Sequence, residues 1–308
     1  MQTHDSKEGS DSRRNSRQKS HNDKQKQVPD IIKSEPIIRE ISVSVKMSEK
    51  ISYSEMKNMS IASSVGLRDY QEDFCSFGEL DLKDLPNGRG HFMAVFDGHG
   101  GPETSKKASE SVLNLFGKSM IAAKGNIPEA LEETVKELVS LTAGDRSGST
   151  LSLVYIPSSR EFAHAAVLGD SPVIVFDKRG KVVLSPEHNA RSNLEERNRA
   201  IMKGADFKFG YLFSANGGGL QLSRALGNNH LSDFLGKIPE IYSVPLGEKS
   251  FVVVGSDGLF DPNHKCTLVQ CGRISDMLQT GANAKELVRD ALERCTKDNV
   301  TAMVWRPC

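Results

Sequence analysis

Eight short apolar segments dominate the sequence after residue 60 and constrain its fold most strongly. They are IASSV (61–65), HFMAVF (91–96), STLSLVYI (149–156), EFAHAAVL (161–168), PVIVFD (172–177), KVVL (181–184), SFVVVGS (250–256) and NVTAMVW (299–305). Each has the length of a strand, is mostly β-branched or aromatic, and is bounded by turn residues at most ends. Residues 169–171 and 178–180 are short enough to be hairpin loops, so we expect 161–168, 172–177 and 181–184 to form consecutive hairpins.

Four further segments, 103–119, 129–142, 193–204 and 284–297, have the pattern of helices. In the second of them Leu131, Val135, Leu138 and Leu141 recur at helical spacing. The first two segments follow each other between runs of hairpins, an arrangement typical of α+β proteins with antiparallel sheets rather than of βαβ repetition. The sequence therefore predicts an α+β fold.

The first 50 residues differ in composition from the rest. Residues 1–27 hold seven Lys or Arg against four Asp or Glu, with almost no apolar side chains. Such a stretch buries too little surface to offset its chain entropy, so we expect 1–50 to be a disordered polar tail and 51–308 to be the folded domain. Within the tail, residues 12–20 fit a nuclear-import patch or a phosphorylation target, although a solubilising role is the simpler interpretation. Residues 28–60 could add an edge strand.

The overall composition excludes several classes of protein. The formal net charge is zero, with 40 Lys or Arg against 40 Asp or Glu, so no global field favours nucleic acid. No apolar run approaches the roughly 18 residues that span a bilayer, and the polar N-terminus is unlike a secretory signal. Five cysteines without a C-x-x-C pair indicate a reducing compartment. We expect a cytoplasmic or nuclear protein that binds neither nucleic acid nor membrane.

Acidic residues recur at the ends of the predicted strands. Asp97 ends MAVF, Asp257 ends VVVGS, Asp298 precedes NVTAMVW, and Glu72-Asp73 lie in GLRDYQEDF. Carboxylates that converge on one rim of a sandwich repel one another unless they are protonated or bridged by a cation. An all-oxygen site suits Mg²⁺ or Mn²⁺ rather than zinc. Taken singly, each acid has a plainer explanation as a turn residue or a helix cap.

The order of seven segments adds to this pattern. They are GLRDYQED (66–73), VFDGHGG (95–101), DRSGST (145–150), LGDS (168–171), LQLSRALGN (220–228), GSDGLFD (255–261) and DNVTAMV (298–304). In these segments the sequence resembles the metal-dependent serine/threonine protein phosphatases of type 2C, from about residue 66 to residue 305. The resemblance implies a sandwich of two antiparallel β-sheets flanked by pairs of α-helices, in four αββα layers.

The resemblance also implies two or three Mg²⁺ or Mn²⁺ ions at one end of the sandwich. By motif position, Asp97 bridges two ions and Gly98 adds its carbonyl oxygen. The other implied metal-site residues are Glu72 on one ion, Asp257 and Asp298 on the other, Asp73 through metal-bound waters, and Asp170 on a weaker third ion. For Asp170 the sequence alone favours a plain turn.

Two residues are implied to act on the substrate. Arg68 matches the arginine that binds the phosphate, and it would share a face with Glu72 if that segment were a regular strand. His99 matches the general acid that protonates the leaving seryl or threonyl oxygen. The implied reaction is hydrolysis of phosphoserine and phosphothreonine in proteins by a metal-bridging hydroxide, without a phosphoenzyme. We expect phosphorylated proteins as partners and a monomeric enzyme.

Three departures from the family pattern bear on the loops beside this site. Pro172 replaces an arginine, Glu187-His188 replaces Asp-His, and Asn228 replaces an aspartate. His188 and His230 are conceivable further acids, but structural roles are the simpler interpretation. An alternative function is that of an inactive relative that binds phosphoproteins, which the retained acidic residues argue against. A regulatory phosphatase with one dedicated phosphoprotein partner, as in bacterial sporulation, is another alternative.

Overall fold

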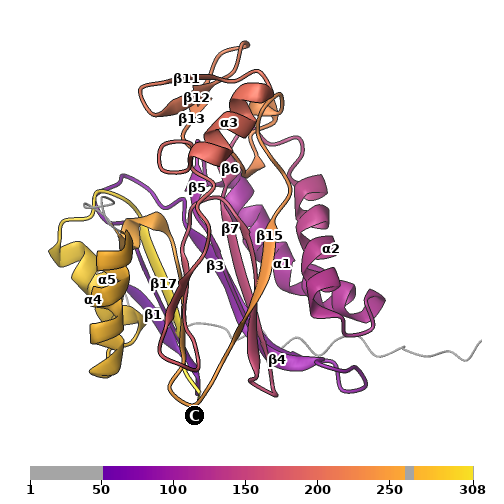
Figure 1. The fold of residues 1–308 in the computed structure, drawn as a ribbon, viewed down its shortest axis with the longest axis vertical. Helices are drawn as coiled ribbons and strands as arrows, with labels where there is room; N and C mark the ends of the chain where they lie inside the picture. The colour runs from indigo at the N-terminus through magenta and orange to yellow at the C-terminus, as the bar shows by residue number, and fades with distance from the viewer. Residues whose placement is uncertain (1–50, 261–266, 308) are drawn as a thin grey trace, which may run out of the picture. The chain divides into compact units, whose positions relative to one another are not determined.

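The computed structural model describes residues 51–260 and 267–307. The predicted polar tail, 1–50, lies outside the described residues. Two antiparallel sheets form the centre of the described region (Figure 1). In spatial order, the six-stranded sheet consists of β1 (Ser52–Glu55), β2 (Met59–Ser64), β17 (Val300–Trp305), β16 (Phe251–Gly255), β9 (Val173–Phe176) and β10 (Val182–Leu184). The five-stranded sheet consists of β15 (Glu240–Pro245), β8 (Phe162–Leu168), β7 (Leu151–Pro157), β4 (Arg89–Phe96) and β3 (Phe74–Asp81).

Strand β4 shows why these segments are almost continuously apolar. Its residues Met93 and Val95 pack between the two sheets, whereas Phe92, Ala94 and Phe96 face the helices on the other side. Alternate residues of a strand point to opposite faces, so a strand covered on both faces needs apolar residues throughout. All five of these side chains are fully buried.

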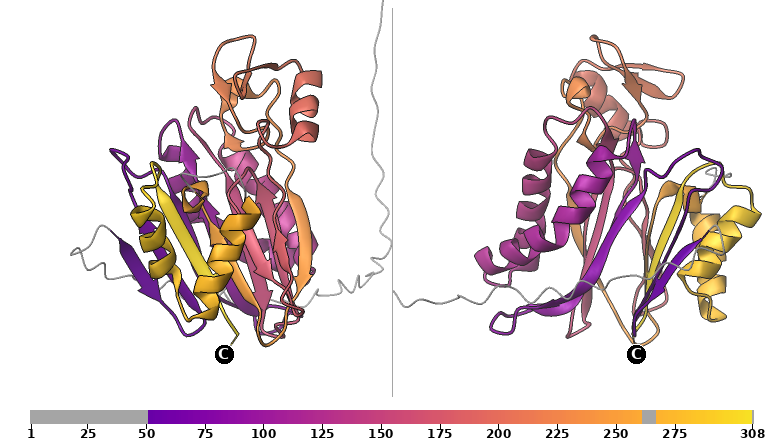
Figure 2. Two further views of the ribbon diagram at one scale, coloured as in Figure 1. Left: turned by 60° about the vertical axis from the view of Figure 1, so that its left-hand side comes forward. Right: turned by 180° about the vertical axis from the view of Figure 1, so that it is seen from behind.

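A pair of helices covers the outer face of each sheet, as Figures 1 and 2 show. Helices α1 (Glu103–Ala122) and α2 (Ile127–Leu141) share a core with the five-stranded sheet. Helices α4 (Thr267–Gln279) and α5 (Ala284–Glu293) share a core with the six-stranded sheet. The predicted four-layer αββα sandwich is confirmed. Helix α4 was not predicted. None of the helices in the described part of the chain is long and apolar enough to cross a membrane.

A smaller unit lies at one end of the sandwich, and we call its residues 190–235 the flap (Figure 1). It contains α3 (Leu194–Met202) and a sheet of β11 (Asp206–Lys208), β12 (Tyr211–Phe213) and β13 (Gly219–Leu220). The flap has its own core, which includes Leu212 and Phe234. Strands β12 and β13 form an antiparallel pair that is joined through the glycine-rich residues 214–218.

The expected hairpin between 161–168 and 172–177 is wrong. Strand β8 belongs to the five-stranded sheet and β9 to the six-stranded sheet, so residues 169–171 cross from one sheet to the other. Packed sheets lie about 10 Å apart, and three extended residues at about 3.3 Å each span that distance. The predicted hairpin of β9 and β10 is confirmed, with Val182 opposite Phe176.

Candidate metal and phosphate site

The strand registers bring the predicted acids to one end of the sandwich. Strands β3 and β4 pair Phe74 with Phe96, so Asp73, just before β3, and Asp97, just after β4, lie at the same end of that pair. Strands β16 and β17 pair Gly255 with Ala302, which places Asp257 and Asp298 just beyond their own pair. Asp170 lies in the crossing loop directly after β8. Sequence neighbours of five different strands therefore converge on one rim.

Asp97 is the electrostatic centre of this rim. Burial raises the pKa of Asp97 well above its ordinary value, and the nearby charges of Asp73, Asp257, Asp170 and Asp298 add to the effect. The backbone N–H of Asp257 donates to Asp97 Oδ2 at 3.3 Å. Because like charges disfavour one another's ionised form, the cluster is strained when every carboxylate is charged.

Asp73 and Asp170 are each held by uncharged donors. The hydroxyls of Ser256 and Thr301 donate to Asp73 Oδ2 at 2.6 and 2.8 Å. Burial nevertheless raises the pKa of Asp73 to about 7, against the opposing effect of these two bonds. The amide of Asn189 donates to Asp170 Oδ2 at 2.7 Å, while burial and then the charge of Asp257 raise the pKa of Asp170 to about 7.

Glu72 is placed by a loop that Asn299 organises. The Asn299 side chain accepts the backbone N–H of Glu72 at 2.7 Å and donates to the carbonyls of Val65 and Tyr70. Glu72 Oε1 in turn accepts the backbone N–H of Gly101 at 2.7 Å. The chain passes so close at Gly98 that a Cβ there would lie 2.4 Å from the Glu72 carbonyl oxygen. Glycine at 98 is thus required for the two metal-site segments to meet.

Arg68 does not lie on a regular strand, so the condition under which it would share a face with Glu72 is not met. Residues 66–70 form turns and bends, and the carbonyls of Val65 and Tyr70 accept bonds from the Asn299 side chain instead of from a neighbouring strand. The Arg68 guanidinium donates to Asp298 Oδ2 at 2.6 Å and to the Lys297 carbonyl at 3.0 Å. Its side chain is half exposed. Arg68 therefore reaches the rim and forms an ion pair with one of the predicted metal ligands.

His99 lies on a small sheet beside the acids. Strands β5 (Gly98–His99), β6 (Gly148–Ser149) and β14 (Leu226–Gly227) form this sheet, with His99 opposite Gly148. His99 Nε2 is 2.7 Å from Asn228 Oδ1. Burial lowers the pKa of His99; the bond to Asn228 raises it, and the charges of Lys237 and His230 lower it further. Lys237 fixes β14 by donating to the carbonyls of Ala225 and Gly227 at 2.7 and 2.6 Å.

The donor set at the rim fits a hard divalent cation, since it consists of carboxylates without His or Cys. A cation would also relieve the repulsion that raises the pKa of Asp97. Among residues 51–260 and 267–307, however, no three His, Cys, Asp or Glu side chains form a group that could hold an ion as they stand. Glu72, Asp170 and Asp298 instead bond to Gly101, Asn189 and Arg68. In Glu72 and Asp170 this bond occupies one carboxylate oxygen and leaves the other for an ion, whereas in Asp298 an ion would compete with Arg68 for Oδ2.

Sequence reasoning missed the residues that support this rim. Ser256 and Thr301 hold Asp73, Asn299 holds the Glu72 loop, and Asn228 contacts His99. Ser256, Asn299 and Thr301 lie next to a predicted ligand or in its motif, and this position is the only hint of their role that the sequence offers. Asn228 was noticed only as a departure.

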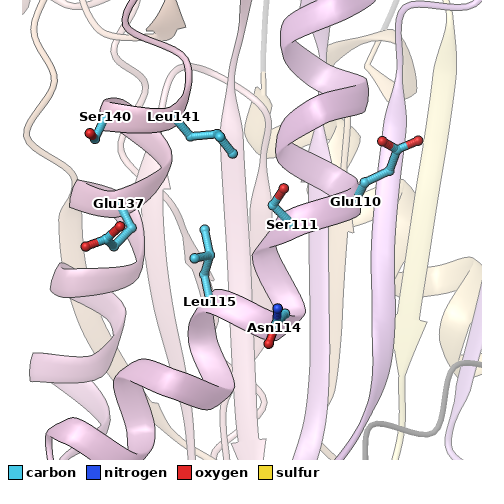
Figure 3. A pocket seen from close by; sticks show the side chains of 7 residues that line it. All are labelled: Glu110, Ser111, Asn114, Leu115, Glu137, Ser140 and Leu141. Atoms are coloured by element: carbon cyan, nitrogen blue, oxygen red, sulfur yellow. The ribbon is translucent and has the colours of Figure 1, made fainter.

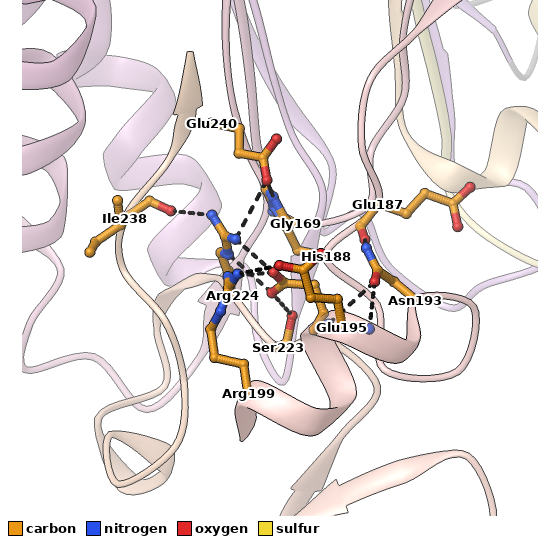
Figure 4. Close-up of polar contacts among 11 residues, drawn as sticks. Gly169, Glu187, His188, Asn193, Glu195, Arg199, Ser223, Arg224, Ile238 and Glu240 are labelled. Carbon is orange, nitrogen blue, oxygen red and sulfur yellow. Dashed lines mark hydrogen bonds and ion pairs between the residues drawn. The ribbon is translucent and has the colours of Figure 1, made fainter. Parts of the chain in front are cut away.

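A buried ionic network joins the flap to the sandwich (Figure 4). Arg224 donates to both carboxylate oxygens of Glu196, at 2.6 and 3.0 Å, and to the carbonyl of Ile238 at 2.9 Å. His188 is fully buried, and its Nδ1 accepts the backbone N–H of Gly169 at 3.0 Å. His188 thus supports the loop before Asp170, which agrees with the structural role expected for it.

A groove of 380 Å³ lies on the outer helices and shares no lining residue with this rim (Figure 3). Side chains of α1 and α2 line it, among them Glu110, Leu115 and Glu137. None of the residues predicted for the site lines this groove.

Known proteins resemble the chain in both sequence and fold. It is 29% identical over 254 residues to "Probable protein phosphatase 2C 11" of Arabidopsis thaliana, an alignment that covers 78% of this chain and 64% of that protein. It is 27% identical over 233 residues to "Protein phosphatase 2C homolog 1" of Saccharomyces cerevisiae, covering 69% and 80%. The chain thus spans less than two thirds of the Arabidopsis relative.

Solved structures share the fold at lower identity. The serine-threonine phosphatase 2C from Toxoplasma gondii superposes with a TM-score of 0.63 at 18% identity, covering 82% of this chain and 98% of that one. A C. elegans sex determining protein also gives a TM-score of 0.63, at 22% identity, covering 82% and 66%. The family model "Protein phosphatase 2C" matches residues 58–300. This match covers well over half of the sequence, and the chain belongs to the protein phosphatase 2C family.

Proposed function

We propose that the protein hydrolyses phosphoserine and phosphothreonine in protein substrates. The observation that carries the proposal is the convergence of Asp73, Asp170, Asp257 and Asp298 on Asp97, beside His99 and Arg68. Family membership supports a metal-dependent protein phosphatase. The choice of serine and threonine over tyrosine rests on the resemblance of the motifs.

Each group at the rim has a chemical task that suits this reaction. The Arg68 guanidinium can bind two phosphate oxygens, since its planar fork matches their spacing. His99, when protonated, can donate a proton to the leaving seryl or threonyl oxygen. Its neighbour Asn228 orients the ring at 2.7 Å. The resemblance of the motifs implies that water attacks phosphorus directly, without a phosphoenzyme.

The acids are proposed to hold two or three Mg²⁺ or Mn²⁺ ions. Asp97 would contact both main ions, and the Gly98 carbonyl would add a ligand. Glu72 would bind one of these ions, and Asp257 and Asp298 the other. Asp73 would act through water and Asp170 on a further ion. Bound there, the ions acidify water into a nucleophile and neutralise the phosphate charge.

The first test is hydrolysis of a phosphothreonine peptide by the purified protein with Mn²⁺, with Mg²⁺ and with EDTA. Wild-type turnover should depend on the metal, and Asp97→Asn should abolish it while circular dichroism remains unchanged. A folded protein without turnover in either metal would contradict the proposal. In that case, retained binding of the phosphopeptide would favour a phosphoprotein-binding relative.

The setting of the reaction is also proposed. Cys75, Cys271 and Cys295 are free thiols in the described residues, which supports a reducing compartment, the cytoplasm or the nucleus. We propose that the enzyme acts as a monomer on phosphorylated proteins. Sedimentation and microscopy of a tagged chain test these points, and a stable dimer or a secreted product would contradict them.

A further inference from the structure

A polar groove of 590 Å³ opens between the flap and the loops that flank the small sheet. Its lining includes Arg146, Asn216, Asn229, His230 and Asp233. The glycines at 217 and 218, in the turn between β12 and β13, form part of its wall. The predicted site residues do not line it, so the groove is a separate feature.

The strand registers place this groove beside His99. Gly148 of β6 lies opposite His99 on one side and opposite Gly227 of β14 on the other. Arg146 comes two residues before Gly148, and Asn229 comes two residues after Gly227. Both walls of the groove thus leave the small sheet at the level of His99. His230 is near enough for its charge to lower the pKa of His99.

Hydrogen bonds between its two walls build the base of the groove. The backbone N–H of Asn229 donates to the Asp145 carbonyl at 2.9 Å, and the Asn229 amide donates to the Gly144 carbonyl at 3.0 Å. The backbone N–H of Asn228 donates to the Ser147 carbonyl at 2.9 Å. These bonds hold Arg146 on a defined loop, which is the condition for recognising a ligand without a large ordering cost.

Charge gives the groove a preference for one negative side chain. In the described part of the chain, the exposed Arg146 guanidinium makes no hydrogen bond or ion pair. The two nearby carboxylates already have partners: Lys107 binds Asp145 at 2.6 and 2.8 Å, and the Ser214 hydroxyl donates to Asp233 at 2.7 Å. His230 offers an additional ring nitrogen. Lys107 neutralises Asp145, but the uncharged Ser214 hydroxyl leaves Asp233 negative. One unpaired guanidinium near a remaining negative charge suits a singly charged carboxylate better than a doubly charged phosphate.

We propose that this groove binds an acidic side chain, aspartate or glutamate, close to the phosphorylated residue of the substrate. The proposal rests on the phosphatase activity proposed above. It makes Arg146 a specificity residue that contacts the flank of the peptide and takes no part in the reaction at phosphorus.

The test uses the full chain with Mn²⁺ and neutral phosphothreonine peptides in which one flanking residue is glutamate or its isostere glutamine. We expect glutamate at one position to raise kcat/KM about fivefold over glutamine, the scale of an exposed ion pair. Arg146→Gln should bring this ratio to about one. The advantage should also decline as salt is added, because the pair is exposed.

Arg179→Gln is the matched control, since Arg179 is an exposed arginine in the turn between β9 and β10. It should keep the wild-type ratio. The proposal is overturned if no position favours glutamate, if the preference survives in Arg146→Gln, or if that variant lowers both peptides equally. Para-nitrophenyl phosphate and the neutral peptide report the phosphatase activity itself. If neither is hydrolysed, the ratio of the affinities for the glutamate and glutamine peptides, measured by fluorescence anisotropy, tests the groove without any need for phosphatase activity.

Discussion

His99 and Asn228 form a side-chain pair in which the amide fixes the proton on the ring. Asn228 Nδ2 donates to the Arg146 carbonyl at 3.3 Å, so the amide oxygen faces His99 Nε2 at 2.7 Å. In the neutral ring Nε2 is then the donor, and Nδ1 is the atom that gains the proton needed for acid catalysis. Gly148 lies opposite His99 on the neighbouring strand, and a Cβ at 148 would be 2.3 Å from His99 Nε2, so a side chain there would displace the ring.

Asn228→Asp should raise the pH at which His99 loses its catalytic proton. Burial lowers the pKa of His99, and a carboxylate partner would favour the charged ring where the neutral amide now sits. We expect the alkaline limb of the kcat profile to move up by about one pH unit. Asn228 has φ 51°, a conformation that aspartate also tolerates, so the backbone should persist.

The control for this prediction is Asn229→Asp, which introduces the same charge one residue further on. Its side chain bonds to the Gly144 carbonyl and not to His99. The alkaline limb should move much less in this variant. An equal shift in both variants, or a downward shift in Asn228→Asp, would show that the direct pair does not govern His99.

Arg68→Gln should separate phosphate binding from metal binding. The guanidinium bonds to Asp298 Oδ2 at 2.6 Å, where it competes with any cation for that carboxylate. We expect the KM of a phosphothreonine peptide to rise about tenfold, because a charge-assisted bidentate contact is lost. Affinity for Mn²⁺, measured by calorimetry without substrate, should increase.

Arg89→Gln provides the comparison for Arg68. Arg89 forms an exposed ion pair with Asp81 at 2.8 Å, at the end of the β3–β4 pair opposite Asp73 and Asp97. Neither KM nor Mn²⁺ affinity should change in that variant. Weaker Mn²⁺ binding in Arg68→Gln would contradict the competition described here.

The metal-free protein should lose stability as the pH rises from 5 to 8. Asp73 and Asp170 have pKa values of about 7 in the folded state, whereas the pKa of an unfolded aspartate is about 3.9. Between these values the folded state holds more protons than the unfolded state, so unfolding becomes easier as pH rises through 7. Differential scanning calorimetry in EDTA should show Tm falling over this range.

Mn²⁺ should reverse that trend, since it binds ionised carboxylates and stabilises the folded state. Its effect on Tm should therefore be larger at pH 8 than at pH 5. In Asp73→Asn the fall in Tm without metal should become shallower, because one titrating group is removed. A Tm that rises with pH in EDTA for the wild type would refute the electrostatic account of the rim.

Local patterns in the sequence predicted individual strands, the α+β class and the acids at strand ends, because these follow from single segments. The four αββα layers were implied by the resemblance of the motifs. A segment such as 91–96 is apolar throughout because both its faces are covered, and Asp97 follows where it reaches the rim. Local patterns do not predict which strand pairs with which. The three-residue link at 169–171 fits a hairpin or a crossing equally well, and the packing of two whole sheets decides between them.

Neither helix α4 nor the conformation around Arg68 could be predicted from local patterns, for related reasons. Helix α4 contains Gly272 and several residues of low helix propensity, yet Cys271, Ile274 and Leu278 are buried against the six-stranded sheet. Tertiary burial stabilises it where propensity is weak. The conformation at residue 68 depends on bonds from Asn299, more than 200 residues away, which no local pattern reveals.

Glu196→Gln should loosen the flap without affecting the sandwich. Glu196 and Arg224 are both buried, and the carboxylate also accepts the Ser223 hydroxyl at 2.6 Å. Burial alone would raise the pKa of Glu196, but bonds from Arg224 and Ser223 outweigh it and hold that pKa below its ordinary value. The amide oxygen introduced at 196 can still accept one bond from Arg224, but it carries no charge. Among the described ion pairs, the buried guanidinium then keeps only the more exposed Glu240, at 3.5 Å, as a charged partner.

Breaking a buried pair in this way costs about 3 kcal/mol of the stability of the flap. Glu195→Gln is the matched control, because Glu195 is 85% exposed and pairs only with Arg199 at 3.3 Å among the described ion pairs. That variant should stay within about 0.5 kcal/mol of the wild type. Hydrogen exchange should accelerate at residues 190–235 in Glu196→Gln while the amides of β7 remain protected. Uniform acceleration across both regions would show instead that the flap and the sandwich unfold as one unit.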